Sequence, residues 1–186
     1  MSLKTPVIAV FDIGKTNKKV FLWSTTFEIV FEKQQTFDEI VDEDGFACED
    51  LGALQQWIVS TFAELCQFPE FEIIGLNFSA YGASFVYVDR VGEPVAPLYN
   101  YLKPVSKAFP YAEYSGENEF ARKTASPILG NLNSGLQVYA AQFKAFWPEV
   151  HQALHFPNYL ASLFTGKFFS EITRSEEHTS ELQSRL

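Results

Sequence analysis

The sequence predicts an α/β domain with a mixed sheet and flanking helices. Two apolar, β-branched runs near its start, Val7–Phe11 and Lys19–Trp23, predict strands joined by a tight turn. Apolar side chains then recur at helical spacing from Leu51 to Leu65, and a further strand is predicted at Phe71–Ser79. Strands that alternate with a helical crossover are typical of α/β sheets.

Composition narrows the class of protein. The chain has 186 residues, 47% of them hydrophobic, which is enough for one domain with a sizeable core. Its net charge is −9 and it has no basic stripe interleaved with aromatic residues, which argues against nucleic acid as a ligand. The apolar runs are too short to span a bilayer and no signal-peptide core is present, so we expect no membrane partner and a cytoplasmic location. Cys48 and Cys66 fit a reducing compartment, where free thiols are favoured over a disulfide.

The turn after the first strand is the first candidate site. The strand ends at Asp12, and Gly14, Lys15, Thr16 and Asn17 follow. Backbone N–H groups in such a turn can cradle phosphate oxygens, and a carboxylate beside them can hold Mg²⁺ through water. Glycine allows the backbone to approach a ligand closely. The alternative is an ordinary hairpin turn, because hairpin turns also favour Asp and Gly.

The segments that follow continue the sheet. Residues 27–37 alternate apolar and polar side chains, as expected of a third, antiparallel and half-exposed strand. The acidic stretch Asp38–Asp50 is predicted to be a solvated loop, with a metal site as the alternative. Asp50 is placed to cap the helix that begins at Leu51.

A second candidate site lies where the Phe71–Ser79 strand ends. The loop from Ser79 to Ser84 consists mostly of small residues, and another strand is predicted at Ser84–Asp89. Open α/β sheets bind ligands beyond their strand ends, so we expect this loop to lie near Asp12. The alternative is an ordinary tight connection whose small residues serve packing.

The last part of the chain is predicted to contain two helices. One spans Gly135–Trp147, with a further helical turn opened by Pro148. The other spans Phe156–Lys167 and is ended by Gly166. His151 and His155 are expected on this helical stretch as structural residues rather than ligands.

Three segments, in order and at family spacing, resemble the FGGY carbohydrate kinases, which are actin/hexokinase-like ATPases with an RNase H-like core. Asp12, Gly14 and Thr16 match their DxGTT phosphate hairpin, with Lys15 in place of the first threonine. The run YGASFV at residues 81–86 resembles the Trp-Gly-x-Asp-Phe-Val loop of rhamnulokinases. The run PNYLASLFTG at residues 157–166 resembles the family's Pro-x-Asp-Tyr-Leu…Thr-Gly helix end. The resemblance covers residues 6–173 and implies an incomplete N-terminal domain.

The resemblance implies transfer of the ATP γ-phosphoryl group to a sugar hydroxyl, with ATP and Mg²⁺ as cofactors. It implies that Asp12 holds the metal, while the turn residues Gly14, Lys15, Thr16 and Asn17 meet phosphate. The implied sugar-binding residues are Tyr81, Gly82, Ala83, Ser84 and Asn100. A ketose or deoxyketose such as rhamnulose or fuculose is the expected substrate, and the full-length protein is a candidate homo-oligomer. The family's catalytic Asp and adenine pocket match nothing in this chain, so we expect no catalytic residue and no kinase activity here.

Two alternatives stay open. A non-catalytic actin-like nucleotide-binding or interaction module would share the phosphate hairpin and need no sugar loop. A truncated domain that does not fold stably is the other, because a half-built sheet leaves apolar faces uncovered. The run RSEEHTSELQS from Arg174 resembles a translated sequencing-library adapter, so we expect residues 174–186 to be a non-native, disordered tail after a domain at 1–173.

Overall fold

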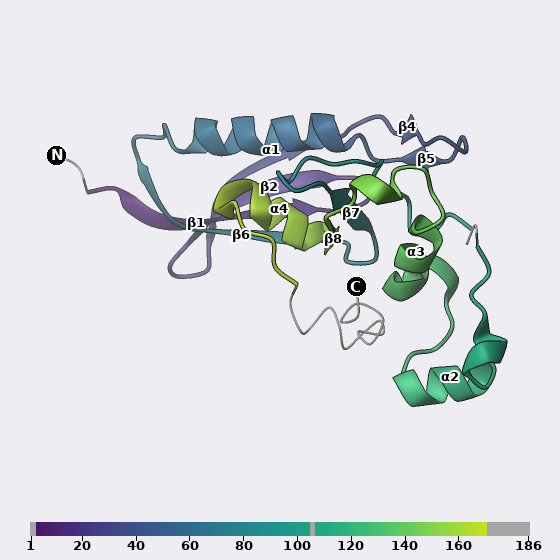
Figure 1. Ribbon diagram of the computed structural model, residues 1–186. Helices are drawn as coiled ribbons and strands as arrows, with labels where there is room; N and C mark the ends of the chain where they lie inside the picture. The colour runs from purple at the N-terminus through teal and green to yellow at the C-terminus, as the bar shows by residue number, and fades with distance from the viewer. Residues whose placement is uncertain (1–2, 105–106, 171–186) are drawn as a thin grey trace.

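The structure is a computed structural model that describes residues 3–104 and 107–170 (Figure 1). Its centre is a four-stranded sheet in the order β3-β2-β1-β6. The strands are β1 (Thr5–Ile13), β2 (Lys18–Ser24), β3 (Ile29–Gln35) and β6 (Phe71–Ala80). The expected tail at 174–186 lies outside the described residues.

The sheet is mixed, as predicted. β1 pairs antiparallel with β2, and β2 pairs antiparallel with β3. β6 pairs with β1 in parallel, because the chain crosses over through α1 (Leu51–Leu65) before it returns to the sheet. The side chain of Asp50 accepts a hydrogen bond from the backbone N–H of Ala53, which confirms it as the N-cap of α1.

One face of the sheet carries the main core. Alternate residues of β1, from Val7 to Ile13, are fully buried on this face. They pack against Leu54 and Ile58 of α1 and against Tyr159 of α4 (Phe156–Thr165). The predicted stop of α4 is confirmed, because Gly166 caps it in the left-handed conformation. The opposite face leaves apolar side chains partly uncovered, with Ile74 56% exposed.

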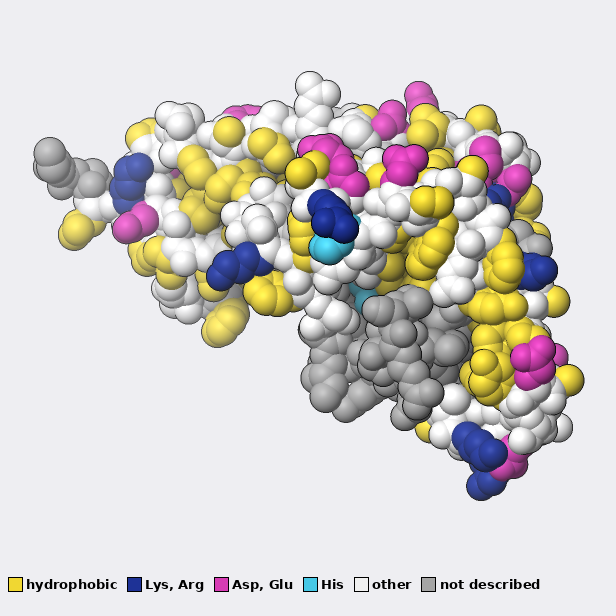
Figure 2. Space-filling view, viewed as in Figure 1, with side chains coloured by type: hydrophobic (Ala, Val, Ile, Leu, Met, Phe, Trp, Pro, Cys, Tyr) yellow, Lys and Arg dark blue, Asp and Glu magenta, His cyan; other side chains and the backbone are white. Residues whose placement is uncertain are grey.

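A smaller part of the molecule lies beyond the end of the sheet at which β1 and β6 stop (Figure 1). Its elements are β4 (Ile40–Val41), β5 (Ala47–Cys48), β7 (Phe85–Val88), β8 (Gln152–His155), α2 (Glu117–Thr124), α3 (Ser134–Ala141) and the short 3-10 helices η1 (Tyr111–Tyr114), η2 (Gly130–Leu132) and η3 (Trp147–Glu149). Figure 2 shows hydrophobic side chains gathered around α3 on one side of this part, whereas acidic side chains line the edge near α1 and β4.

Four expectations need correction here. The acidic stretch is not a solvated loop throughout: it forms the β4–β5 hairpin, and Asp42 and Glu49 are buried because lysines pair with them. The helix expected to Trp147 ends at Ala141 and gives way to turns. His155 is not helical but ends β8, which pairs antiparallel with β7. His151 likewise precedes that strand rather than lying in a helix.

Two further points concern the described residues only. Cys48 is buried and Cys66 is exposed, and both are free thiols, so the expectation of no disulfide between them is confirmed. Within residues 3–104 and 107–170, no helix has the length and apolar character needed to cross a membrane.

Candidate functional site

The β1–β2 turn has the geometry of a narrow backbone loop. The N–H of Gly14 donates to the carbonyl of Asn17 at 3.0 Å, which closes the turn. A Cβ atom at Gly14 would lie 3.0 Å from that carbonyl oxygen, so this position has little room for any side chain. Thr16 and Asn17 are exposed at the tip. The turn therefore offers backbone and hydroxyl groups to a ligand from the surface.

Asp12 lies at the base of this turn. It is part of β1, half-buried, and stands between Lys19 of β2 and Ser79 of β6 in the sheet register. Lys19 is turned to Glu32 instead, at 2.8 Å. Among the described residues, the Asp12 carboxylate has no hydrogen bond or ion pair. It is thus available to hold a cation through water, as the sequence predicts.

The sheet register also places the second candidate site. Asp12 pairs with Ser79, and Ile13 pairs with Ala80, so the loop after β6 begins directly beside the turn after β1. The expectation that these two segments lie together is confirmed. Parallel neighbouring strands explain the result, because their carboxyl ends reach the same edge of the sheet.

Tyr81 is the first side chain of the loop after β6. Its ring contacts Phe156 and Tyr101, with centroids 4.9 and 5.8 Å away, and it is half-buried. Its hydroxyl donates to Oε2 of Glu49 at 3.0 Å. Burial, followed by the charge of Glu49 and the hydrogen bond to it, raises the pKa of Tyr81. The hydroxyl is therefore a neutral donor with a fixed direction.

The other predicted sugar residues use part of their polar capacity within the chain. Ser84 is fully buried and its hydroxyl donates to the carbonyl of Tyr99 at 2.9 Å. The carbonyl of Ala83 accepts a hydrogen bond from Gln137. Asn100 donates to the carbonyl of Ala47 at 3.3 Å. In this conformation, what the loop can offer a ligand is Tyr81 and the half-buried backbone of Gly82.

A buried ion pair that the sequence did not predict lies behind the site. Nζ of Lys18 lies 2.5 Å from Oε1 of Glu49, and the two residues are 1% and 5% exposed. The signal was present in the two-residue period of β2, in which Lys18, Val20 and Leu22 share the buried face. Placing the start of this strand at Lys19 left Lys18 outside that pattern.

Lys15, predicted to meet phosphate, pairs with Glu39 at 2.7 Å in the structure. Both side chains are partly exposed, at 29% and 50%. Surface pairs of this kind contribute about 0–1 kcal/mol, so the pair leaves Lys15 free to exchange Glu39 for another anion.

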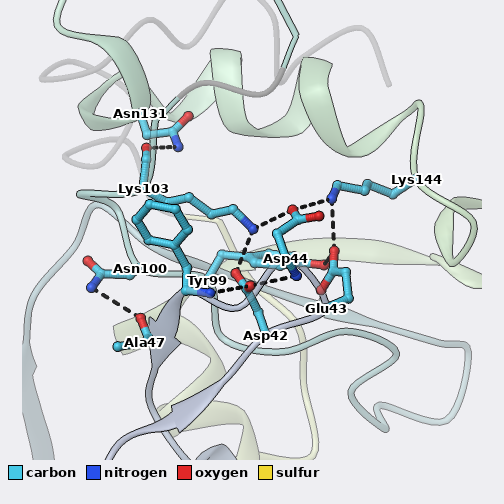
Figure 3. Close-up of polar contacts among 10 residues, drawn as sticks. Asp42, Glu43, Asp44, Ala47, Tyr99, Asn100, Lys103, Asn131 and Lys144 are labelled. Carbon is cyan, nitrogen blue, oxygen red and sulfur yellow. Dashed lines mark hydrogen bonds and ion pairs between the residues drawn. The ribbon is translucent and has the colours of Figure 1, made fainter.

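A separate group of acids and lysines lies on the β4–β5 hairpin; we call it the hairpin cluster (Figure 3). It comprises Asp42, Glu43, Asp44, Lys103 and Lys144. Nζ of Lys103 lies 2.6 Å from Asp42 and 2.7 Å from Asp44. Nζ of Lys144 lies 2.9 Å from both Glu43 and Asp44. Figure 3 shows the two lysines approaching Asp44 from opposite sides, so the cluster fastens two distant segments to the hairpin.

Electrostatics within the hairpin cluster favour the charged forms. Hydrogen bonds from Lys103 and Lys144 lower the pKa of Asp44 to about 2. Burial alone would raise the pKa of Asp42, but hydrogen bonds from Lys103 and from two backbone N–H groups outweigh burial and lower it. These lysines are neutralised by three carboxylates, so the cluster is a structural clamp rather than an anion site.

Binding of a cation at this site would need ligands from both Asp12 and a bound phosphate. Over the part of the chain that the structure describes, no three His, Cys, Asp or Glu side chains are grouped to hold a metal ion. An Asp12 carboxylate without internal partners, next to a turn that a Cβ atom would crowd, fits Mg²⁺ carried in with phosphate. Asp12, Gly14, Thr16 and Asn17 are the residues that would hold such a group.

Comparison with solved structures identifies the fold. The chain matches a carbohydrate kinase from Novosphingobium aromaticivorans with a TM-score of 0.77 at 24% identity, over 95% of this chain and 37% of that one. It matches gluconate kinase from Lactobacillus acidophilus with a TM-score of 0.78 at 16% identity, over 93% and 36%. It matches Plasmodium falciparum glycerol kinase, solved with ADP, with a TM-score of 0.71 at 16% identity, over 96% and 38%. No protein-family model and no curated protein matches the sequence.

The predicted fold class is therefore confirmed: the chain has the mixed α/β fold of a domain found in carbohydrate kinases. It spans 36–38% of the length of these three kinases. The assignment to a rhamnulokinase-like or fuculokinase-like group stays a prediction.

Proposed function

We propose that this chain supplies the phosphate-binding turn and one sugar-facing loop of an ATP-dependent carbohydrate kinase. The observation that carries the proposal is the register of β1 with β6. It sets the Asp12 turn and the Tyr81 loop side by side at one edge of the sheet. A phosphoryl donor and a sugar acceptor must meet in this way before a group can pass between them.

The chemistry asked of these residues is mostly positioning. In phosphoryl transfer a bound Mg²⁺ would neutralise charge on the phosphates, and little covalent chemistry falls to the protein. Asp12 would hold the metal, and the backbone N–H groups of residues 15–17 with the Thr16 hydroxyl would hold phosphate, since the N–H of Gly14 is used inside the turn. Gly14 keeps the turn narrow enough for close approach.

The sugar meets the loop after β6. Tyr81 presents the exposed part of its ring to C–H groups of the sugar, since its other contacts are Phe156 and Tyr101. The backbone at Gly82 offers hydrogen bonds beside it, whereas the carbonyl of Ala83 is used by Gln137. A ketose or deoxyketose, such as rhamnulose or fuculose, is the substrate class we favour, on the basis of the Tyr81–Val86 resemblance.

We assign proton abstraction from the sugar and adenine binding to no residue of this chain. No residue of this chain is proposed as the general base or as part of an adenine pocket, and the kinases that it matches are more than twice as long. We therefore expect no sugar phosphorylation by the chain alone. A turnover rate comparable to that of a full-length carbohydrate kinase would contradict this assignment.

Calorimetric titration of the chain with Mg·ATP and Mg·ADP tests the nucleotide half of the proposal. We expect binding that EDTA weakens and that Asp12→Asn weakens about tenfold, or about 1.4 kcal/mol. The matched control is Glu72→Gln, which neutralises an exposed carboxylate at the other end of the sheet, opposite Pro6. Absence of binding at millimolar nucleotide, or equal binding by Asp12→Asn, would contradict the proposal.

The sugar half is tested by titration with rhamnulose, fuculose and xylulose, with Tyr81→Ala as the variant. We expect one ketose to bind and the variant to lose that binding. Nucleotide binding without any sugar binding would favour the non-catalytic nucleotide-dependent module instead.

A further inference from the structure

We propose that Lys18 and Glu49 are positioning residues that couple the phosphate turn to Tyr81. The coupling rests on the proposed function for its use in catalysis, but its geometry is a property of the chain itself. Neither side chain faces a ligand, because both are buried. Each acts through a neighbour that does.

Lys18 connects to the phosphate turn. Its Nζ donates to the backbone carbonyl of Lys15 at 3.0 Å, inside the turn that Gly14 and Asn17 close. The same Nζ lies 2.5 Å from Oε1 of Glu49. The ammonium group is thus shared between the turn and one carboxylate oxygen.

Glu49 connects to the sugar loop. Its second oxygen, Oε2, accepts the hydrogen bond from the Tyr81 hydroxyl at 3.0 Å. The backbone of Glu49 is also fixed, because it bridges to Leu98 and directly precedes the N-cap of α1. A carboxylate on such a rigid base transmits a shift of Lys18 to Tyr81 instead of absorbing it.

The contact between Lys18 and Glu49 is an ion pair, and this supports a coupling role. A buried ion pair stabilises a fold no more than an apolar pair of the same size, because removing both charges from water offsets their attraction. Only the ion pair can bond to a carbonyl of the turn at one end and to a hydroxyl of the loop at the other.

The consequence is that a phosphate bound to the β1–β2 turn restrains Tyr81 in the loop after β6. Phosphate bound to residues 14–17 holds the carbonyl of Lys15, which fixes Lys18, Glu49 and so the hydroxyl of Tyr81. Tyr81 then presents its ring in one orientation. Nucleotide binding thereby orders the surface that the sugar meets.

Amide hydrogen exchange on the ligand-free chain, followed by NMR, tests the coupling directly. The first variant is Tyr81→Phe, which keeps the ring and removes the hydroxyl. We expect the amide of Gly14, whose hydrogen bond to Asn17 closes the turn, to exchange about tenfold faster, the effect of losing one hydrogen bond to a charged group. Amides in the centre of β1 report any general loss of stability, and a merely structural role would speed them equally.

A double-mutant comparison isolates the path. In Lys18→Met/Glu49→Gln the two buried charges are removed together, so the fold keeps no lone buried ion. Adding Tyr81→Phe to this background should leave exchange of the Gly14 amide unchanged. Lys33→Met, which breaks the exposed pair with Glu64, is the matched control and should change none of these amides.

Two results would overturn the coupling. One is unchanged exchange of the Gly14 amide in Tyr81→Phe. The other is an equal change whether or not Lys18 and Glu49 are present. Neither result depends on ligand binding. A chain that shows the coupling but fails to bind Mg·ATP would instead count against the proposed kinase function alone.

Discussion

Two polar networks that involve the β4–β5 hairpin and the residue directly after it are built in opposite ways. The Lys18–Glu49–Tyr81 network is buried, and each carboxylate oxygen has one side-chain partner. The hairpin cluster is partly open to water, and most of its carboxylates have alternative donors. In the buried network, displacing one residue therefore moves its single partner. In the surface cluster, another donor can replace a contact that is lost, so a displacement goes no further.

The same difference sets the cost of disturbing each network. Removing one partner of a buried pair leaves an uncompensated charge, which costs about 3–5 kcal/mol. Removing one partner of an exposed pair costs about 0–1 kcal/mol, because water and neighbouring groups replace it. The predictions below test this ordering, from the most buried lysine to the most exposed.

Lys18→Met is expected to have the largest effect on stability. It leaves the Glu49 carboxylate, in a residue only 5% exposed, without its counter-ion, so the free energy of unfolding should fall by about 3–5 kcal/mol. Urea unfolding measures the change. Lys18→Met/Glu49→Gln should recover most of the loss, and Lys33→Met should cost under about 1 kcal/mol. If Lys18→Met lowered the free energy of unfolding by no more than about 1 kcal/mol, the two networks would be alike and the comparison would be contradicted.

Lys103→Met should have an intermediate effect. The side chain of Asp42 is 0% exposed, but it keeps hydrogen bonds from the backbone N–H groups of Asp44 and Phe46. Loss of one donor to a buried group costs about 1–3 kcal/mol. Thermal and urea unfolding of Lys103→Met beside Lys18→Met provide the ranking. A cost equal to that of Lys18→Met would show that the hairpin cluster is not redundant.

The hairpin cluster should also make the thermal stability of the chain depend on pH in the acidic range. The pKa of Asp44 is lowered to about 2 in the folded chain, and that of Asp42 is lowered too, against about 3.9 for an unfolded aspartate. A depressed folded pKa contributes stability above the unfolded value and loses it as pH falls through the folded value. Melting temperature should therefore drop between about pH 4 and pH 2. Asp44→Asn should flatten this slope, and an unchanged slope would contradict the role of Asp44.

Lys144→Met should have the smallest effect. Lys144 is 25% exposed, and Lys103 still satisfies Asp44 when it is lost. We expect a cost of about 0–1 kcal/mol in urea unfolding. A cost above that of Lys103→Met would reverse the ordering on which the comparison rests.

The fold could be predicted from sequence where local pattern and tertiary environment agree. The β1–β2 hairpin, the Asp50 cap and the Gly166 stop all follow from short-range signals. Each of these depends on residues within one turn or one hairpin. The parallel return of β6 to β1 then follows from the rules of crossover connections.

The rest depended on partners far away in the sequence. Asp42 and Glu49 looked like solvated acids, because nothing local shows that Lys103 and Lys18 meet them 61 and 31 residues away. Likewise, β7 pairs with β8, and Gln152 of β8 lies 67 residues after Phe85 of β7. The four residues of β8 are too few to show a clear strand period in the sequence. Such pairings are tertiary and override local propensity.

The candidate site divides along the same line. Asp12 and Gly14 could be selected from sequence, because a strand-ending carboxylate and a glycine turn carry a local meaning. Ser84 could not be judged: its position in the motif suggested a ligand contact, whereas the structure buries its hydroxyl against the carbonyl of Tyr99. Lys18 and Glu49 escaped notice because their role depends on their being buried together.

One measurement tests the central claim most directly: a map of backbone amide shifts as Mg·ADP is added to the chain. The account predicts saturable shifts confined to residues 14–17 and 79–84, and their loss in Asp12→Asn. Shifts that fall only on the hairpin cluster, or none at all at saturating nucleotide, would contradict the claim that the β1–β2 turn and the loop after β6 form one phosphate-and-sugar site.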